Sequence, residues 1–192
     1  MPDKIYIKKN ATHTSFCLSY SNSIRSDGRD SLDSGMKGFF LLNKQRNKYR
    51  GFVKEGKKEG VGEVKWEDGC KFLGKFSENK ANGFGLFLDG KGSKFTGEYE
   101  NNIPKGWGIF THYNGAKFQG YWEGKKQNSI GFEIWPDGTY FQGEYRDSKK
   151  HGLGTYRWPD GTMYDGEWEN NLINGYVYLL FYLILGYYFI QR

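Results

Sequence analysis

Residues 141–163 read FQGEYRDSKKHGLGTYRWPDGTM, and the same 23-residue pattern recurs along most of the chain. Blocks that begin at residues 49, 72, 95, 118, 141 and 164 each start with Tyr or Phe and carry Gly at position 3. An aromatic ring recurs at position 5 of five blocks, and Gly recurs at positions 12 and 14 of five blocks each. Fixed spacing of this kind is typical of a repeat array, in which each unit packs against its neighbours.

Each block predicts a two-stranded hairpin. Positions 1 to 6 and 12 to 18 show the alternation with period two that is typical of a β-strand. Polar turns separate these segments, and Asp-Gly or Asn-Gly at positions 20 and 21 predicts type I′ turns between blocks. Because a lone hairpin is marginally stable, the hairpins must stack. We therefore expect an all-β fold, an elongated single-layer antiparallel sheet of 23-residue hairpin repeats.

The glycines predict how the rings pack. Positions 3, 12 and 14 share a face with the rings at positions 1 and 5, and we expect these glycines to let the rings lie on the backbone. Position 13 points to the opposite face and is apolar in all six blocks. Its residues are Val61, Phe84, Trp107, Ile130, Leu153 and Tyr176. Both faces of the sheet are therefore expected to carry apolar side chains.

The chain divides into three regions. Residues 1–48 predict a mostly flexible, basic segment that can include a capping strand at 39–43, and residues 49–175 form the array. Residues 176–192 are apolar and follow the point at which the repeat frame is lost. Three interpretations of this tail stay open: a capping strand, a membrane tail anchor, or an artefact of the gene model.

Charge and cysteine content limit the partners. The chain has 192 residues and a net charge of +6, but Lys and Arg balance Asp and Glu within residues 49–175. The surplus lies in residues 1–48 and at Arg192, so the array has no basic excess for nucleic acid. Cys17 and Cys70 have no disulfide or metal-binding spacing, which favours a reducing, cytoplasmic location.

No active site is visible in the sequence. The three histidines, His13, His112 and His151, lie far apart and have no recurring acidic or nucleophilic partner. Nucleophile-elbow, zinc-protease and phosphate-loop motifs are absent from the sequence. We expect no enzymatic activity, no catalytic residues, no metal site and no cofactor.

The repeat resembles the MORN repeat (membrane occupation and recognition nexus). The resemblance covers residues 49–175 and is clearest from Phe141 to Tyr145, then at Lys149, Gly152 and Gly154, and through the run Trp158-Pro159-Asp160-Gly161. Such repeats accompany phosphatidylinositol phosphate kinases, junctophilins, a SET-domain methyltransferase, radial-spoke heads and protist cytoskeletal scaffolds. The resemblance implies a non-enzymatic scaffold or adaptor that binds proteins or itself, in the cytoplasm at cytoskeletal or ciliary structures.

Two surfaces are candidate binding sites. The first is an aromatic trough for a protein partner or a second copy. Its residues are Phe76, Tyr99, Trp122, Tyr145, Trp168, Trp135 and Trp158. The second is a row of turn lysines for anionic lipid headgroups. Its residues are Lys57, Lys58, Lys125, Lys126, Lys149 and Lys150.

Two alternative functions follow from these candidates and from the resemblance. One is a peripheral membrane tether that binds anionic phospholipid or phosphoinositide. The other is a regulatory repeat fragment of a phosphatidylinositol phosphate kinase. Acidic residues precede the lysines in the same turns, which favours a solvated edge over a lipid site.

Overall fold

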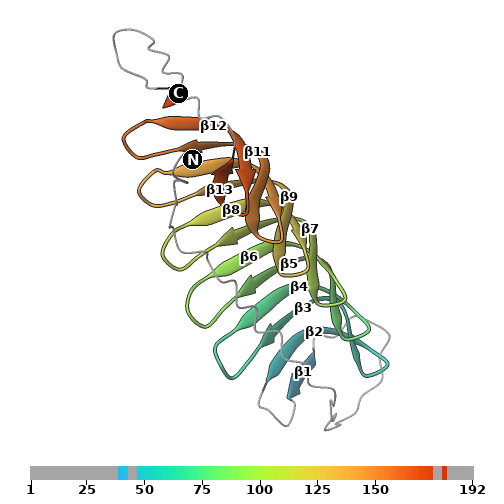
Figure 1. The fold of residues 1–192 in the computed structure, drawn as a ribbon. Coiled ribbons are helices and arrows are strands. Elements are labelled where there is room, and N and C mark those ends of the chain that lie inside the picture. The colour runs from blue at the N-terminus through green and yellow to red at the C-terminus, as the bar shows by residue number, and fades with distance from the viewer. Residues whose placement is uncertain (1–38, 43–46, 175–178, 181–192) are drawn as a thin grey trace. The chain divides into compact units, whose positions relative to one another are not determined.

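The computed structural model describes residues 39–42, 47–174 and 179–180 (Figure 1). The chain divides into two compact units with a boundary between Gly106 and Trp107. Strands of the first unit follow one another in sequence order. They are β1 (Phe39–Leu42), β2 (Lys48–Lys54), β3 (Lys57–Lys65), β4 (Lys71–Ser77), β5 (Lys80–Leu88) and β6 (Lys94–Glu100).

The second unit continues in the same antiparallel pattern. Its strands are β7 (Ile103–Thr111, which contains the boundary), β8 (Lys117–Glu123), β9 (Lys126–Ile134), β10 (Tyr140–Arg146), β11 (Lys149–Arg157), β12 (Met163–Glu169), β13 (Leu172–Asn174) and β14 (Leu179–Leu180). No helix occurs in the part of the chain that the structure describes. The predicted all-β class and the stacked antiparallel hairpins are confirmed.

The tight turns lie at the other connection from the one predicted. In the turn between β4 and β5, Glu78 and Asn79 both have positive φ, 50° and 69°, as a type I′ turn requires. In the Asp-Gly connection between β3 and β4, only Gly69 has a positive φ, 87°. Its N–H donates to the Trp66 carbonyl at 3.2 Å, which closes a wider loop. The assignment of type I′ turns to the Asp-Gly connections is therefore wrong.

The rings at position 1 lie on glycine backbone, as predicted for positions 3 and 14. A Cβ built on Gly85 would lie 2.4 Å from Cζ of Phe72. The position 12 glycines act differently, because they form left-handed bulges. Gly152 has φ of 65°, and its Cβ would meet Glu144 on the opposite face. Ser129 occupies the same position with φ of 57°, so these residues turn the strand instead of receiving a ring.

The core of each unit is a ladder of edge-to-face rings. In the first unit Phe72 contacts Phe76 of its own repeat at 5.2 Å and Tyr99 of the next repeat at 5.0 Å. In the second unit Phe118 contacts Trp122 at 5.2 Å and Tyr145 at 5.0 Å. T-shaped contacts of this kind add to the free energy gained by burial. Each ring therefore ties one hairpin to the next.

A side-chain clamp at position 8 also joins neighbouring repeats. Asn102 accepts the Ala81 N–H through Oδ1 at 2.6 Å, and its own N–H donates to the Ala81 carbonyl at 2.9 Å. Three further residues make the same pair of bonds to the preceding repeat: Asn79 to Lys58, Ser148 to Gln127, and Asn171 to Lys150. Each clamp joins the start of the second strand of one repeat to the tight turn of the next repeat.

The clamp predicts the order in which substitutions of Asn102 reduce the free energy of unfolding. Asn102 has φ of 70°, so Asn102→Gly keeps the turn and removes only the side-chain bond, at a cost of about 1 kcal/mol. Asn102→Ala adds the strain of a left-handed alanine and is expected to cost about 2 kcal/mol. Asn102→Asp keeps the acceptor and serves as the control. Urea unfolding followed by tryptophan fluorescence measures the series, and a glycine variant as stable as the wild type would contradict the clamp.

The flanking segments are described only in part. Strand β1 is hydrogen bonded to β2, with Leu41 opposite Tyr49, at the place of the expected capping strand. Strand β14 pairs with β12, with Leu179 opposite Tyr164. The expected flexibility of residues 1–38 and the nature of residues 181–192 lie outside the described residues.

Candidate functional site

The position 5 rings of the predicted trough form the core of the sheet. Phe76, Tyr99, Trp122, Tyr145 and Trp168 are all buried. Trp135 and Trp158 lie at the loop edge and are half-buried. Trp122 and Trp168 donate their indole N–H groups to the carbonyls of Gly108 and Gly154 at 3.2 and 3.0 Å. Partner binding by these rings stays a prediction, and their burial gives them a packing role.

One acidic residue enters this core in the second unit. Glu133 is buried and accepts the Tyr145 hydroxyl at 3.0 Å and the Lys150 ammonium at 3.5 Å. Lys150 Nζ also lies 5.0 Å from the centre of the Trp135 ring and 5.1 Å from that of Phe141. Burial and the Glu133 carboxylate raise the pKa of Tyr145 well above its usual value. This cluster is a charged insertion in an otherwise aromatic core.

Tyr99 occupies the same repeat position as Tyr145, but it lacks this arrangement. Its hydroxyl is buried and has no hydrogen-bond partner among the described residues. Burial raises the pKa of Tyr99. The residue in the place of Glu133 is Phe87, which offers no acceptor.

These two tyrosines predict opposite responses to loss of the hydroxyl. Tyr99→Phe removes an unsatisfied buried group and is expected to leave stability unchanged or to raise it by up to about 1 kcal/mol. Tyr145→Phe removes a bond to a carboxylate and is expected to cost about 2 kcal/mol. Chemical unfolding of both variants gives the comparison. Equal destabilisation by the two substitutions would contradict the assignment.

The predicted lysines lie in or beside the tight turns, but their side chains do not share one face. Successive residues of a strand point to opposite faces, so the two lysines of a pair diverge. Lys58 and Lys150 point inward over aromatic rings, with Lys58 Nζ 5.7 Å from the centre of Phe76. Burial lowers the pKa of Lys58. The six lysines therefore do not present one common face, and lipid binding by them stays a prediction.

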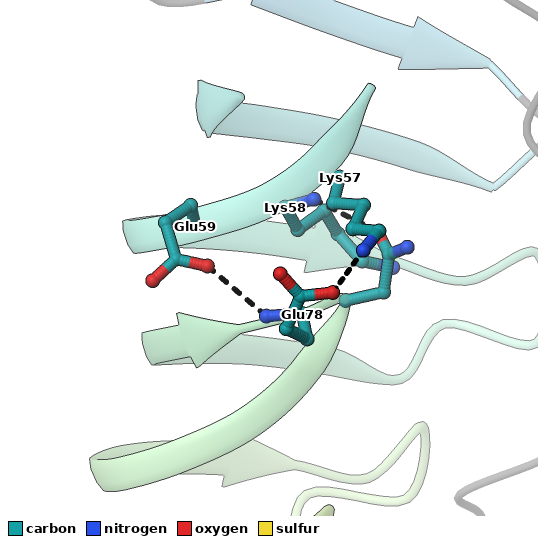
Figure 2. Close-up of polar contacts among 5 residues, drawn as sticks. Lys57, Lys58, Glu59 and Glu78 are labelled. Atoms are coloured by element: carbon teal, nitrogen blue, oxygen red, sulfur yellow. Dashed lines mark hydrogen bonds and ion pairs between the residues drawn. The ribbon is translucent and has the colours of Figure 1, made fainter. Parts of the chain in front are cut away.

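The outward lysines are largely neutralised by the next repeat. Figure 2 shows the Lys57 ammonium at the Glu78 carboxylate, while Glu59 accepts the Glu78 N–H at 3.0 Å. Lys126 makes the equivalent ion pair with Asp147 at 2.6 Å. The hydrogen bond to each carboxylate raises the pKa of Lys57 and of Lys126. Lys125 and Lys149 are exposed near their turns.

In each unit the exposed apolar side chains lie on the face opposite its ring ladder, which we call the outer face. Position 13 is its centre: Phe84 and Ile130 are each 60% exposed and Leu153 is 61% exposed. Phe52, Leu73, Trp107, Ile109 and Tyr121 are also exposed on outward positions. The sequence showed this apolar row, but nothing in its period-two pattern distinguished the covered face from the open one.

The described residues offer no metal cluster. Across residues 39–42, 47–174 and 179–180, no three His, Cys, Asp or Glu side chains gather at a distance suited to a metal ion. In the same ranges, no helix has the length and apolar character needed to cross a membrane. The expected lack of catalytic residues and cofactors stays a prediction.

The hairpin geometry and the ring-on-glycine packing coincide with a known repeat. The MORN repeat model matches residues 49–71, 72–94, 95–117, 118–140, 141–163 and 164–176. The chain belongs to the MORN repeat family. MORN repeats indicate a repeat-based protein-interaction module. No curated protein sequence matches the chain.

Two solved structures resemble the chain in fold. The SAS-4 (dCPAP) TCP domain of Drosophila melanogaster, in complex with a proline-rich motif of Ana2 (dSTIL), has a TM-score of 0.50 and 13% identity, over 88% of this chain and 97% of that chain. The TCP10c domain of Drosophila melanogaster Sas-4 has a TM-score of 0.43 and 13% identity, over 73% and 82%. At these identities the likeness concerns the fold alone.

Proposed function

We propose that this MORN-repeat chain is a non-enzymatic scaffold that binds protein partners through its outer face. The exposed position 13 row carries the proposal, because Phe84, Ile130 and Leu153 are more than half exposed. Contiguous exposed apolar surface on a folded chain marks interaction sites. The ring ladder on the opposite face already supplies the buried core, so the exposed apolar side chains of the outer face are not needed for folding.

The similar sheet of SAS-4 supports binding to proteins, since its structure contains a proline-rich motif of Ana2. A cytoskeletal or ciliary location, as the family resemblance suggested, belongs to the same proposal. Fluorescent tagging against cytoskeletal and ciliary markers measures it. A uniform cytosolic signal would contradict this location. It would not bear on the scaffold role, which the binding experiment tests separately.

The binding test compares interaction partners that are identified by mass spectrometry after crosslinking. Ile130→Glu with Leu153→Glu places charge on the outer face, and these positions tolerate it because both are exposed. Tyr113→Glu is the matched control, because Tyr113 is 65% exposed but lies in a loop. We expect a defined set of proteins to be lost in the double variant and kept in the control. An identical set in all three chains would overturn the proposal.

The membrane tether has less structural support. Of the six candidate lysines, Lys57 and Lys126 pair with carboxylates of the next repeat, and Lys58 and Lys150 lie over aromatic rings. Flotation with liposomes that contain phosphoinositide, at low salt, tests the tether directly. The kinase-fragment alternative rests on the family resemblance alone.

A further inference from the structure

The outer face of the first unit carries lysines that line up across its strands. Lys48 lies opposite Lys65, and Lys65 lies opposite Lys71 on the next strand. Leu88 lies opposite both Lys71 and Lys94, so the line crosses from β2 to β6 with one apolar interruption. We call Lys48, Lys65, Lys71 and Lys94 the cross-strand lysines.

This arrangement is unfavourable in the free chain, because like charges directly opposite each other destabilise a sheet. Glu63 lies 3.5 Å from Lys65 and offsets one of the four charges. Among the residues that the structure describes, Lys48, Lys71 and Lys94 form no ion pair. All four lysines are exposed. They therefore form a basic surface that an anionic partner would stabilise.

The second unit has no such line at the same repeat positions. Ile134 lies opposite both Lys117 and Tyr140. Arg157 lies opposite both Tyr140 and Met163. In these pairs each basic residue meets an uncharged one, so the repeat frame itself does not require adjacent lysines.

Leucines lie beside the cross-strand lysines. Leu73 and Leu86 are opposite each other two residues along the strands from Lys71 and Leu88. Leu73 is 50% exposed, and Leu86 and Leu88 are half-buried. A partner with negative charge alone would leave these leucines in water. The surface is therefore complementary to a segment that presents acidic and apolar side chains next to each other.

The spacing of the lysines favours a helix as that segment. Neighbouring strands lie about 4.8 Å apart, so Lys48, Lys65 and Lys71 follow one another at about this distance. A helix that lies across the strands presents one side chain per turn, about every 5.4 Å. An extended chain presents side chains on one face only about every 6.7 Å. The four strand spacings from Lys48 to Lys94 span about 19 Å, the length of about 13 helical residues.

We propose that the cross-strand lysines and their neighbouring leucines bind an amphipathic protein helix with an acidic stripe beside an apolar stripe. Its Asp or Glu side chains, one helical turn apart, pair with the lysines. Its apolar side chains cover Leu73, Leu86 and Leu88. This inference rests on the proposed function, because it assigns a chemical class of partner to the outer face.

Other anionic partners are less complementary to this surface. The loops that border the lysines carry Glu67, Asp68 and Asp89 together with one lysine, Lys91. A flat anionic membrane at this edge would also meet the three carboxylates, which repel it. A nucleic acid has no apolar side chains to cover the leucines. A single helix pairs with the lysines and covers the leucines without extending over the loops.

Fluorescence anisotropy with the full chain tests the proposal. The probe is a labelled helical peptide of about 15 residues, with Glu at one-turn spacing and Leu beside each Glu. A matched peptide has Gln in place of every Glu. Liposomes that contain phosphoinositide and a single-stranded RNA oligonucleotide are the competing probes.

Two variants lose the same amount of positive charge. The first removes three of the cross-strand lysines: Lys65→Gln, Lys71→Gln and Lys94→Gln. The second, the control, removes three exposed basic residues of the second unit: Lys117→Gln, Lys149→Gln and Arg157→Gln. Circular dichroism checks that both variants keep the β-sheet.

We expect the Glu peptide to bind the wild type and the control equally, and to bind the cross-strand variant about tenfold more weakly. Binding is expected to weaken as salt rises, because the paired charges lie at an accessible surface. The Gln peptide is expected to bind all three chains weakly. A Glu peptide that does not bind the wild type, or that binds both variants equally, would overturn the proposal. Liposomes or RNA that bind through these lysines in place of the peptide would overturn it as well.

Urea unfolding of the free chains is a second measurement. Removing the opposed lysines is expected to raise the urea midpoint above that of the wild type, since it relieves repulsion between neighbouring strands. A lower midpoint in the cross-strand variant would show that these lysines stabilise the fold through partners of their own, and would contradict a surface kept for a ligand.

The outcome is separable from that of the proposed function. If Ile130→Glu with Leu153→Glu removes identified partners but the Glu peptide does not bind, the scaffold stands and the acidic helix is overturned. If the peptide binds through the cross-strand lysines but the set of partners is unchanged by those substitutions, the reverse holds.

Discussion

Replacing Gly85 by alanine is expected to remove about 3 kcal/mol of stability, the upper range for overpacking a core. The new Cβ would lie 2.4 Å from Cζ and 2.7 Å from Cε2 of Phe72. The ring has little room to move, because it is 1% exposed and packs edge to face on Phe76 and Tyr99. Since one ring bridges two repeats, its displacement weakens the contact between hairpins as well as the hairpin itself.

Gly56→Ala is the matched control. Gly56 has φ of 73° and nothing within 4 Å of a built Cβ, so alanine there adds only backbone strain of about 1 kcal/mol. Thermal and urea unfolding of the two variants separate ring overlap from backbone conformation. If Gly85→Ala cost no more than Gly56→Ala, ring-on-backbone packing would not be what fixes glycine at position 14.

The repeat, the hairpins and the ring-on-glycine packing could be predicted because each depends on local sequence. The ring of Phe72 and the glycines at 74 and 85 recur at fixed spacing, and the missing Cβ of a glycine leaves room for a ring to lie on the backbone. The covered face was harder to predict, since Tyr99 at position 5 and Phe84 at position 13 are both aromatic. The deciding contrast lies across strands: Phe84 faces Glu98 and Val61 faces Lys75, so charges line the open face.

The details that sequence reasoning missed depend on partners in another repeat. Asn102 clamps Ala81 across 21 residues, although recurrence of Asn at position 8 was a visible signal. The turn type was misassigned because Asp-Gly fits a type I′ turn in general, whereas here Asp68 accepts the Cys70 N–H at 3.0 Å and shapes a wider loop. The sequence analysis missed that neighbouring lysines point to opposite faces, because the direction of each side chain depends on where the strand begins. Lys57 begins β3 and points outward, which sends Lys58 inward.

Removing the Glu133 carboxylate is expected to cost about 3 kcal/mol, since breaking a buried ion pair leaves its partner poorly compensated. In Glu133→Ala, the Lys150 ammonium keeps its contacts with Trp135 and Phe141 but loses the carboxylate 3.5 Å away. The Tyr145 hydroxyl loses its acceptor at the same time. Side chains of Glu133 and Lys150 are only 10% and 13% exposed, so water replaces these partners poorly.

The other repeats provide the compensating substitution. In other repeats the same two positions, 17 residues apart, hold Val64 with Ala81 and Phe87 with Pro104, so an apolar pair fits this frame. Replacing a buried ion pair by apolar side chains of similar volume is often neutral or stabilising. Glu133→Phe with Lys150→Met is therefore expected to recover most of the stability that Glu133→Ala loses. A double-mutant cycle built from urea unfolding of Glu133→Phe, Lys150→Met and the pair measures this coupling. If the losses of the two single variants add up in the double variant, Glu133 and Lys150 do not stabilise each other as a pair.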